Sequence, residues 1–315
     1  MSIQQSAQDE VIRGRPPAPD ILIHLHIPKT GGTSLNSMIQ HAFPDDEVSD
    51  TMVIGSENYN GLGLAPYELC QKRFALYSPD QLRRIRYVTG HLPIGLHRVF
   101  DRPAKYFTVI RHPVDRVISD FFFRIQENEP YLKDDRLLTF DEYVESRSDV
   151  YLCDYQVRVI SGSTELEAER QPIGMQTSGR PVEDRDLEQA KRNIEEHFLT
   201  IAPLENMVEL ALLIRSVYGW PMRRLLNENK NRTKKRLFMR EVSPRTLKII
   251  EECNSSDLKL YEWVSKRFAA QRQSFEPSLS RNEQVFKVIS STLNGAGRLV
   301  PWNTRKWLAQ LLFHA

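Results

Sequence analysis

The chain has 315 residues, of which 40% are hydrophobic and 27% charged, a balance typical of globular proteins and unlike that of disordered chains. Its formal net charge of +2 gives no overall attraction to nucleic acid, so any bound anion must be held by a local cluster. No apolar run approaches the roughly 18 residues that a membrane-spanning helix needs.

Three isolated cysteines, Cys70, Cys153 and Cys253, lack the paired spacing of zinc ligands, and their odd number does not suit a disulfide framework. They favour reduced thiols and a cytoplasmic location. Residues 1–19 are polar and contain prolines but no signal-peptide core, so we expect a flexible leader. Residues 20–315 are expected to form one domain with a helical C-terminal part.

The first half of the chain alternates strand and helix patterns. An apolar run at 21–27 ends at Pro28 and predicts a buried strand, which a helix over 33–41 follows. Residues 44–66 are rich in turn-forming residues and indicate a long loop. Two more strands are expected, one ending at Gly90 and one over 105–110. Strands that alternate with helices predict a parallel sheet.

The second half is predominantly helical. After Pro113, apolar residues recur at helical spacing: Val114, Val117, Ile118, Phe121 and Ile125. Further helices are predicted over 140–146, 154–160, 183–197 and 206–217, with a strand in FLTIAPLE, a surface excursion over 161–181 and a helical, basic final third. The fold class predicted is α/β: a P-loop-like three-layer fold in which helices flank a central, mostly parallel sheet.

The segment PKTGGTS joins the first strand to the first helix and has the composition of an anion-binding loop. Gly31 and Gly32 allow the backbone to approach a ligand, and the following helix N-terminus offers unpaired N–H groups. Lys29 adds a positive charge, and three hydroxyls add donors: Thr30, Thr33 and Ser34. A tight turn with a capped helix is the alternative. Because the lysine precedes the glycines, the loop does not match the GxxxxGK[ST] order of nucleoside triphosphatases.

A second candidate anion site lies in VIRHPVDRVISDFFF. Arg111 follows the third strand, and Ser119 lies eight residues later, off the apolar stripe of the helix. An arginine and a hydroxyl together can bind a phosphate. The alternative is an exposed serine and an arginine paired with Asp115 or Asp120. Together with the first loop, this site favours a nucleotide that is phosphorylated at two positions.

These two motifs resemble those of the sulfotransferases, in particular the carbohydrate branch that contains heparan sulfate 2-O-sulfotransferase. The resemblance extends over residues 21–220 and includes APLENMVELALLIRSVYGW. It implies 3′-phosphoadenosine 5′-phosphosulfate as the donor, with Lys29 and residues 30–34 at the 5′-phosphosulfate. By the same resemblance, Arg111 and Ser119 would bind the 3′-phosphate, and no metal would be required.

The resemblance also implies sulfuryl transfer to an acceptor hydroxyl, in a glycan or a small metabolite. His91, after the second strand, aligns with a catalytic histidine and suits the role of general base because its pKa lies near neutrality. The family has a further histidine two residues earlier, in a His-Gly-His sequence, and Thr89 occupies that position here, which puts a heparan-type acceptor in doubt. The absence of a membrane anchor favours a cytosolic, bacterial member.

Alternative functions are an ATP-dependent P-loop kinase and a non-catalytic nucleotide-binding relative. His24 and His26 share a strand face and could form a metal pair, but buried, hydrogen-bonded histidines are preferred because no third ligand is apparent. The basic run 227–236 is either a solvated turn or a loop over the nucleotide. The amphipathic tail 301–315 packs on the domain, forms a homodimer contact or touches a membrane, and packing is preferred.

Overall fold

The computed structural model describes residues 19–40, 42–50, 70, 74–92, 94–126, 132–133, 136–146, 152–162, 181–220 and 241–275. Several features expected from the sequence lie wholly or mostly outside these residues: the leader, most of the 44–66 loop, the 161–181 excursion, the basic run 227–236 and the tail 301–315. They therefore stay predictions.

A five-stranded sheet forms the centre of the fold, in the order β2-β3-β1-β4-β7, and every neighbouring pair is parallel. Its strands are β1 (Ile21–Leu25), β2 (Val48–Asp50), β3 (Tyr87–Gly90), β4 (Ala104–Ile110) and β7 (Phe198–Pro203). A separate two-stranded antiparallel ribbon joins β5 (Leu132–Lys133) to β6 (Arg136–Leu137). The predicted parallel sheet is confirmed.

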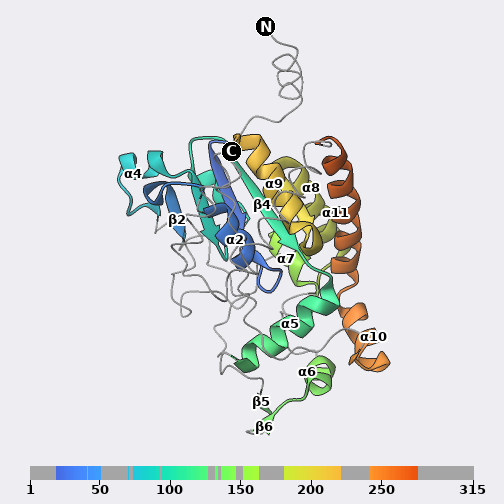
Figure 1. Cartoon of the computed structure of the whole chain (residues 1–315). Helices are drawn as coiled ribbons and strands as arrows, with labels where there is room; N and C mark the ends of the chain where they lie inside the picture. Colours follow the sequence, from blue (N-terminus) through green and yellow to red (C-terminus); the bar gives the residue numbers. More distant parts are fainter. Residues whose placement is uncertain are drawn as a thin grey trace, which may run out of the picture.

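Helices cover both faces of the sheet, which gives three layers (Figure 1). The helices α2 (Gly32–Gln40) and α9 (Met207–Tyr218) pack on one face, in a core with Leu22 and Phe107. The other face packs against α7 (Tyr155–Ser161), α8 (Asp184–His197) and α11 (Ser255–Gln273). Alternate residues of each strand therefore enter opposite cores, as the pleat requires.

Beyond the sheet, a third apolar cluster joins α5 (Pro113–Gln126), α6 (Phe140–Ser146) and α10 (Pro244–Cys253). Figure 1 shows these three helices grouped below the sheet. Four of the five predicted stripe residues of α5 are buried, whereas Ile125 is 37% exposed and lies outside this cluster.

Several short elements are missing from the sequence prediction. The segment read as a loop contains the 3-10 helix η1 (Asp45–Glu47) and the edge strand β2, so that part of the prediction was wrong. The helix α4 (Pro79–Arg84) was also missed, although Ser78 and Gln81 form a capping box at its start. Two further 3-10 helices, η3 (Leu96–Val99) and η4 (Leu204–Asn206), follow β3 and β7.

None of the three cysteines forms a disulfide. Among the described residues, no helix has both the length and the apolarity to cross a membrane.

Candidate active site

The carboxyl ends of β1, β3 and β4 meet at one edge of the sheet because all three strands are parallel. Lys29 follows β1, His91 follows β3 and Arg111 follows β4, so the structure brings these three predicted residues to the same edge. Ligands of open α/β sheets bind at this edge.

Residues 28–34, here called the glycine loop, turn the chain from β1 into α2 with two left-handed residues. Lys29 has φ +67° and Gly31 has φ +93°. The Thr30 hydroxyl is buried and donates to the carbonyl oxygen of Ile27 at 2.9 Å, so this side chain shapes the turn. A glycine adopts such a left-handed conformation without strain, whereas a lysine adopts it at some cost in conformational energy.

The glycine loop presents backbone donors at the start of α2. The amides of Ser34 and Leu35 donate to the carbonyl of Gly31, at 3.1 and 3.2 Å. Among the described residues, the N–H groups of Gly31, Gly32 and Thr33 have no such partner. Thr33 is exposed and Ser34 half-buried, so their hydroxyls lie near a surface. A helix N-terminus with available amides is suited to an anion.

Two side chains fix the glycine loop against the rest of the fold. A Cβ on Gly32 would lie 2.0 Å from the ring of His26, and one on Gly31 would lie 2.5 Å from Leu204 of η4. Both glycines therefore serve close packing as well as backbone freedom. The loop is held between the end of β1 and the end of β7.

The Lys29 side chain reaches α5, where its Nζ lies 3.4 Å from the centroid of the Phe123 ring. Such a cation–π contact orients the ammonium group. Ser119 is half-buried and lies one turn before Phe123, hence on the same side of α5. Among the described contacts, Ser119 has no hydrogen bond to Arg111.

The Arg111 side chain lies directly against the glycine loop. Its Nη1 donates to the carbonyl oxygen of Lys29 at 3.1 Å, and only 7% of the residue is exposed. The two candidate anion sites are thus adjacent. Asp120, one of the two carboxylates considered as a partner of Arg111, accepts from Arg124 at 3.3 Å.

Three histidines form a ring cluster beside the glycine loop. The rings of His24 and His26 stack with centroids 5.2 Å apart, and His91 meets His26 edge to face at 4.8 Å. Thr89 Oγ1 lies 3.0 Å from His24 Nδ1. The predicted hydrogen-bonded, buried state of His24 is confirmed, and His26 emerges as the contact between His91 and Gly32.

Burial keeps His24 and His26 neutral. It lowers the pKa of His24 to about 3, with a smaller contribution from the positive form of His91. The pKa of His26 is held well below its ordinary value, again chiefly by burial and then by His91, His24 and Lys29.

No arrangement of three or more metal-binding side chains occurs in the part of the chain that the structure describes.

Sequence patterns did not identify three contacts of this site: His26 beneath Gly32, Phe123 beside Lys29 and Gln156 at Arg111. His26 was noted only as half of an alternating pair, because sequence alone does not reveal what a strand residue faces. Gln156 lies 45 residues from Arg111, and no local pattern links them.

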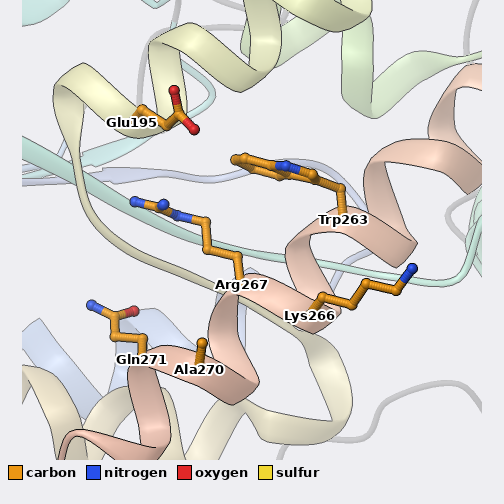
Figure 2. A pocket seen from close by; sticks show the side chains of 6 residues that line it. All are labelled: Glu195, Trp263, Lys266, Arg267, Ala270 and Gln271. Atoms are coloured by element: carbon orange, nitrogen blue, oxygen red, sulfur yellow. The ribbon is translucent and has the colours of Figure 1, made fainter.

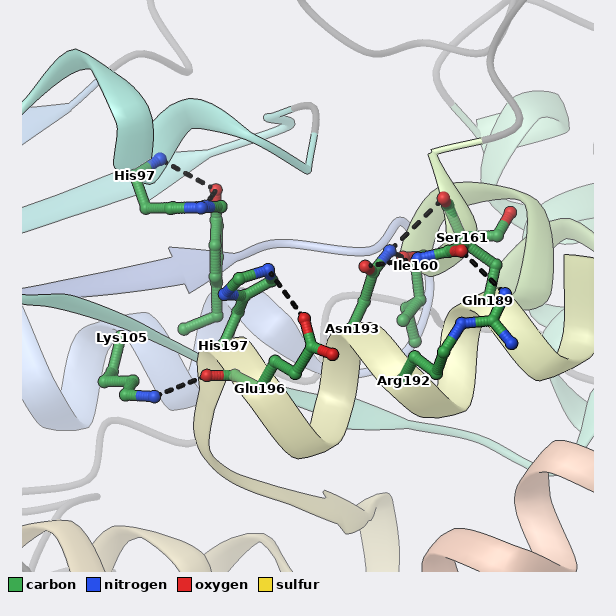
Figure 3. A network of polar contacts seen from close by, with 10 residues as sticks. His97, Lys105, Ile160, Ser161, Gln189, Arg192, Asn193, Glu196 and His197 are labelled. Carbon is green, nitrogen blue, oxygen red and sulfur yellow. Dashed lines mark hydrogen bonds and ion pairs between the residues drawn. The ribbon is translucent and has the colours of Figure 1, made fainter.

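Two other polar features lie away from this edge. An open groove of about 590 Å³ between α8 and α11 is lined by residues that include Glu195, Trp263 and Arg267 (Figure 2). His97 packs against His197, with ring centroids 4.3 Å apart, beside the amino ends of β4 and β7 (Figure 3).

Comparison with known protein families finds a match for most of this chain. Residues 19–264 match the sulfotransferase family, whereas a comparison with curated proteins finds no match. The matched region spans most of the chain and contains the sheet, the glycine loop and the strand-end residues. The chain belongs to the sulfotransferase family.

Proposed function

We propose that this chain transfers a sulfuryl group from 3′-phosphoadenosine 5′-phosphosulfate to a hydroxyl of a carbohydrate or small metabolite. The observation that carries the proposal is the Arg111 guanidinium in contact with the glycine loop, 3.1 Å from the Lys29 carbonyl. Two adjacent cationic groups at the carboxyl edge suit a donor with phosphates at both ends. Family membership supports sulfuryl transfer in general.

The residues fit this donor. The available amides of Gly31, Gly32 and Thr33, with the hydroxyls of Thr33 and Ser34, would bind the 5′-phosphosulfate. Arg111 and Ser119 would bind the 3′-phosphate. Thr30 would contribute through the turn that its hydroxyl stabilises.

The reaction would be an in-line displacement at sulfur. The acceptor oxygen attacks sulfur, the bond from sulfur to the bridging phosphate oxygen breaks, and adenosine 3′,5′-bisphosphate leaves. Lys29 would stabilise the negative charge that develops on the leaving phosphate. His91 would take the hydroxyl proton, since it is half-buried at the same edge and its neighbouring histidines are neutral.

Thr89 is relevant to the identity of the acceptor. This residue, at the position of a second histidine in heparan-type enzymes, is fully buried, and its hydroxyl lies 3.0 Å from His24 Nδ1. It is directed into the fold and so supports His91 as the single base. The two motifs are the basis for proposing the carbohydrate branch of the family, and that branch is the basis for proposing the acceptor.

Ligand binding tests the donor. Adenosine 3′,5′-bisphosphate should raise the melting temperature more than ADP or ATP at equal concentration, because only it has the 3′-phosphate. Arg111→Ala should abolish this difference while leaving the response to AMP unchanged. Stabilisation by ATP alone would instead support an ATP-dependent enzyme.

Transfer of labelled sulfate tests the base. On a panel of glycan and small-molecule acceptors, His91→Ala should lower turnover by about 100-fold or more, with the bisphosphate affinity unchanged. Equal turnover in the wild type and the variant would remove His91 from the mechanism. A wild type that binds the bisphosphate but transfers nothing would indicate a non-catalytic relative.

A further inference from the structure

Gln156, near the start of α7, is joined to the backbone of Arg111 by two hydrogen bonds. The Arg111 N–H donates to Gln156 Oε1 at 2.8 Å, and Gln156 Nε2 donates to the Arg111 carbonyl at 2.9 Å. Gln156 is fully buried. One amide side chain thus satisfies both backbone polar groups of a single residue.

The position of this pairing explains its importance. Arg111 lies between β4, which ends at Ile110, and α5, which begins at Pro113. It therefore lies in the connection between the last residue of β4 and the first of α5, where Gln156 pairs with its backbone N–H and carbonyl. Leaving buried backbone groups unpaired is costly, so the two hydrogen bonds from the Gln156 amide stabilise this connection.

Gln156 is itself fixed from the other side by Asp257 of α11. Asp257 Oδ2 accepts from the backbone N–H of Gln156 at 3.1 Å and from its Nε2 at 3.2 Å. Asp257 Oδ1 accepts from the Val157 N–H at 2.7 Å. A continuous set of hydrogen bonds therefore extends from α11 through α7 to the end of β4.

We propose that Gln156 is a positioning residue that holds the Arg111 backbone so that its guanidinium stays beside the glycine loop, and that it thereby sets the preference for a nucleotide carrying a 3′-phosphate. This inference rests on the proposed function. The guanidinium is held at one end by the Lys29 carbonyl and, through its own backbone, at the other end by Gln156.

The consequence concerns preorganisation. An arginine recognises phosphate through parallel hydrogen bonds whose geometry is sensitive to small displacements. A side chain with several rotatable bonds keeps that geometry only if its backbone is fixed. Loss of the Gln156 amide should therefore weaken binding of the 3′-phosphate and leave the 5′ end, which the glycine loop would hold, unaffected.

The test compares Gln156→Met, which keeps the length of the side chain without its hydrogen bonds, with a matched control at the other end of α7. Asn193, also a buried amide, donates to the carbonyls of Ile160 and Ser161 at 2.8 and 3.2 Å (Figure 3). Asn193 lies on α8, so Asn193→Leu removes two comparable hydrogen bonds from the carboxyl end of α7 and leaves those of Arg111 in place. Full-length proteins are titrated calorimetrically with adenosine 3′,5′-bisphosphate and with AMP.

We expect Gln156→Met to weaken bisphosphate binding about tenfold and AMP binding less than about threefold. The same selectivity for the bisphosphate is expected of Arg111→Ala. Asn193→Leu should change neither affinity, and Gln156→Met should add little loss in the Arg111→Ala background because both act on one interaction. Gln156→Asn, whose shorter amide should not reach Arg111, serves if the methionine variant does not fold. As a readout without ligand, exchange of the Arg111 amide hydrogen should accelerate in the glutamine variants only.

The outcomes separate this inference from the proposed function. Equal losses for both nucleotides, or the same pattern in Asn193→Leu, would make Gln156 merely structural and overturn the inference. A selective effect of Arg111→Ala without one of Gln156→Met would overturn the inference alone. A wild type that does not prefer the bisphosphate over AMP would overturn the 3′-phosphate assignment and the inference with it.

Discussion

At the scale of single residues, Gly32 is the position where the glycine loop tolerates least change. A methyl group there would lie 2.0 Å from the His26 ring, well inside van der Waals contact, and that ring is buried between His24 and His91. Gly32→Ala should therefore lower the free energy of unfolding by about 1–3 kcal/mol and displace the loop amides. Urea unfolding and calorimetric titration with adenosine 3′,5′-bisphosphate measure the two effects.

A control and a rescue sharpen this prediction. Gly219→Ala introduces a side chain at φ +66° in open space, so it should cost about 1–2 kcal/mol of backbone strain and leave nucleotide affinity unchanged. His26→Ala should relieve the clash, so that the double variant is less destabilised than the sum of the single changes. Simple additivity would show that the His26 ring is not what Gly32 accommodates.

Sequence reasoning reached the strand-end residues because their placement follows from strand direction alone. Lys29, His91 and Arg111 need only parallel strands to meet at one edge, and the pairing confirms that condition. The neighbours that adjust them could not be predicted. Gln156 reaches Arg111 across 45 residues, and His26 reaches Gly32 through side-chain packing, so neither contact leaves a local pattern.

At the scale of elements, the longer strands were predictable because they are buried apolar runs, and helices such as α5 because apolar residues recur at helical spacing, whereas β2 and α4 were not. β2 has three residues, Val48–Asp50, at the sheet edge, too few for alternation to be visible. No residue of α4 is buried, so its sequence shows no apolar stripe. Its capping box was the available signal.

The start of α7 depends on a distant carboxylate instead of a local cap. Asp154 at its N-cap position makes no side-chain cap, and Asp257 of α11 accepts from the first helical amides instead. Asp257→Asn would direct an amide NH₂ or a weaker acceptor at these donors, and should lower the free energy of unfolding by about 1–3 kcal/mol. Urea unfolding at neutral pH is the measurement.

Asp184 provides the comparison for this element. It lies in the first turn of α8 with 90% of its side chain exposed, so Asp184→Asn should change stability by less than about 0.5 kcal/mol. If the two aspartate variants were equally mild, the carboxylate of Asp257 would not be what starts α7.

At the scale of the whole molecule, two buried groups make stability depend on pH in opposite directions. Burial, followed by the nearby Asp257 charge, raises the pKa of Asp154 from 3.8 to about 7. Between these values the folded chain keeps a proton that the unfolded chain has released, so stability falls as pH rises through this range. His24 behaves oppositely: with its pKa lowered from 6.5 to about 3, the unfolded chain binds the extra proton, and stability falls as pH falls below 6.5.

Two variants separate these contributions. Asp154→Asn keeps an oxygen to accept from the Asp257 N–H and suits the left-handed φ of +45°, and His24→Gln keeps a polar partner for Thr89. Relative to wild type, Asp154→Asn should gain stability as pH rises from about 4 to 7, because only wild type loses a bound proton there. His24→Gln should gain relative stability as pH falls from about 6.5 towards 3.

Each difference should change by at most about 1.4 kcal/mol per pH unit, the limit for one titrating group. Urea midpoints measured from pH 4 to 8 test both slopes, and a difference from wild type that stays constant across that range would contradict the pKa assigned to that group.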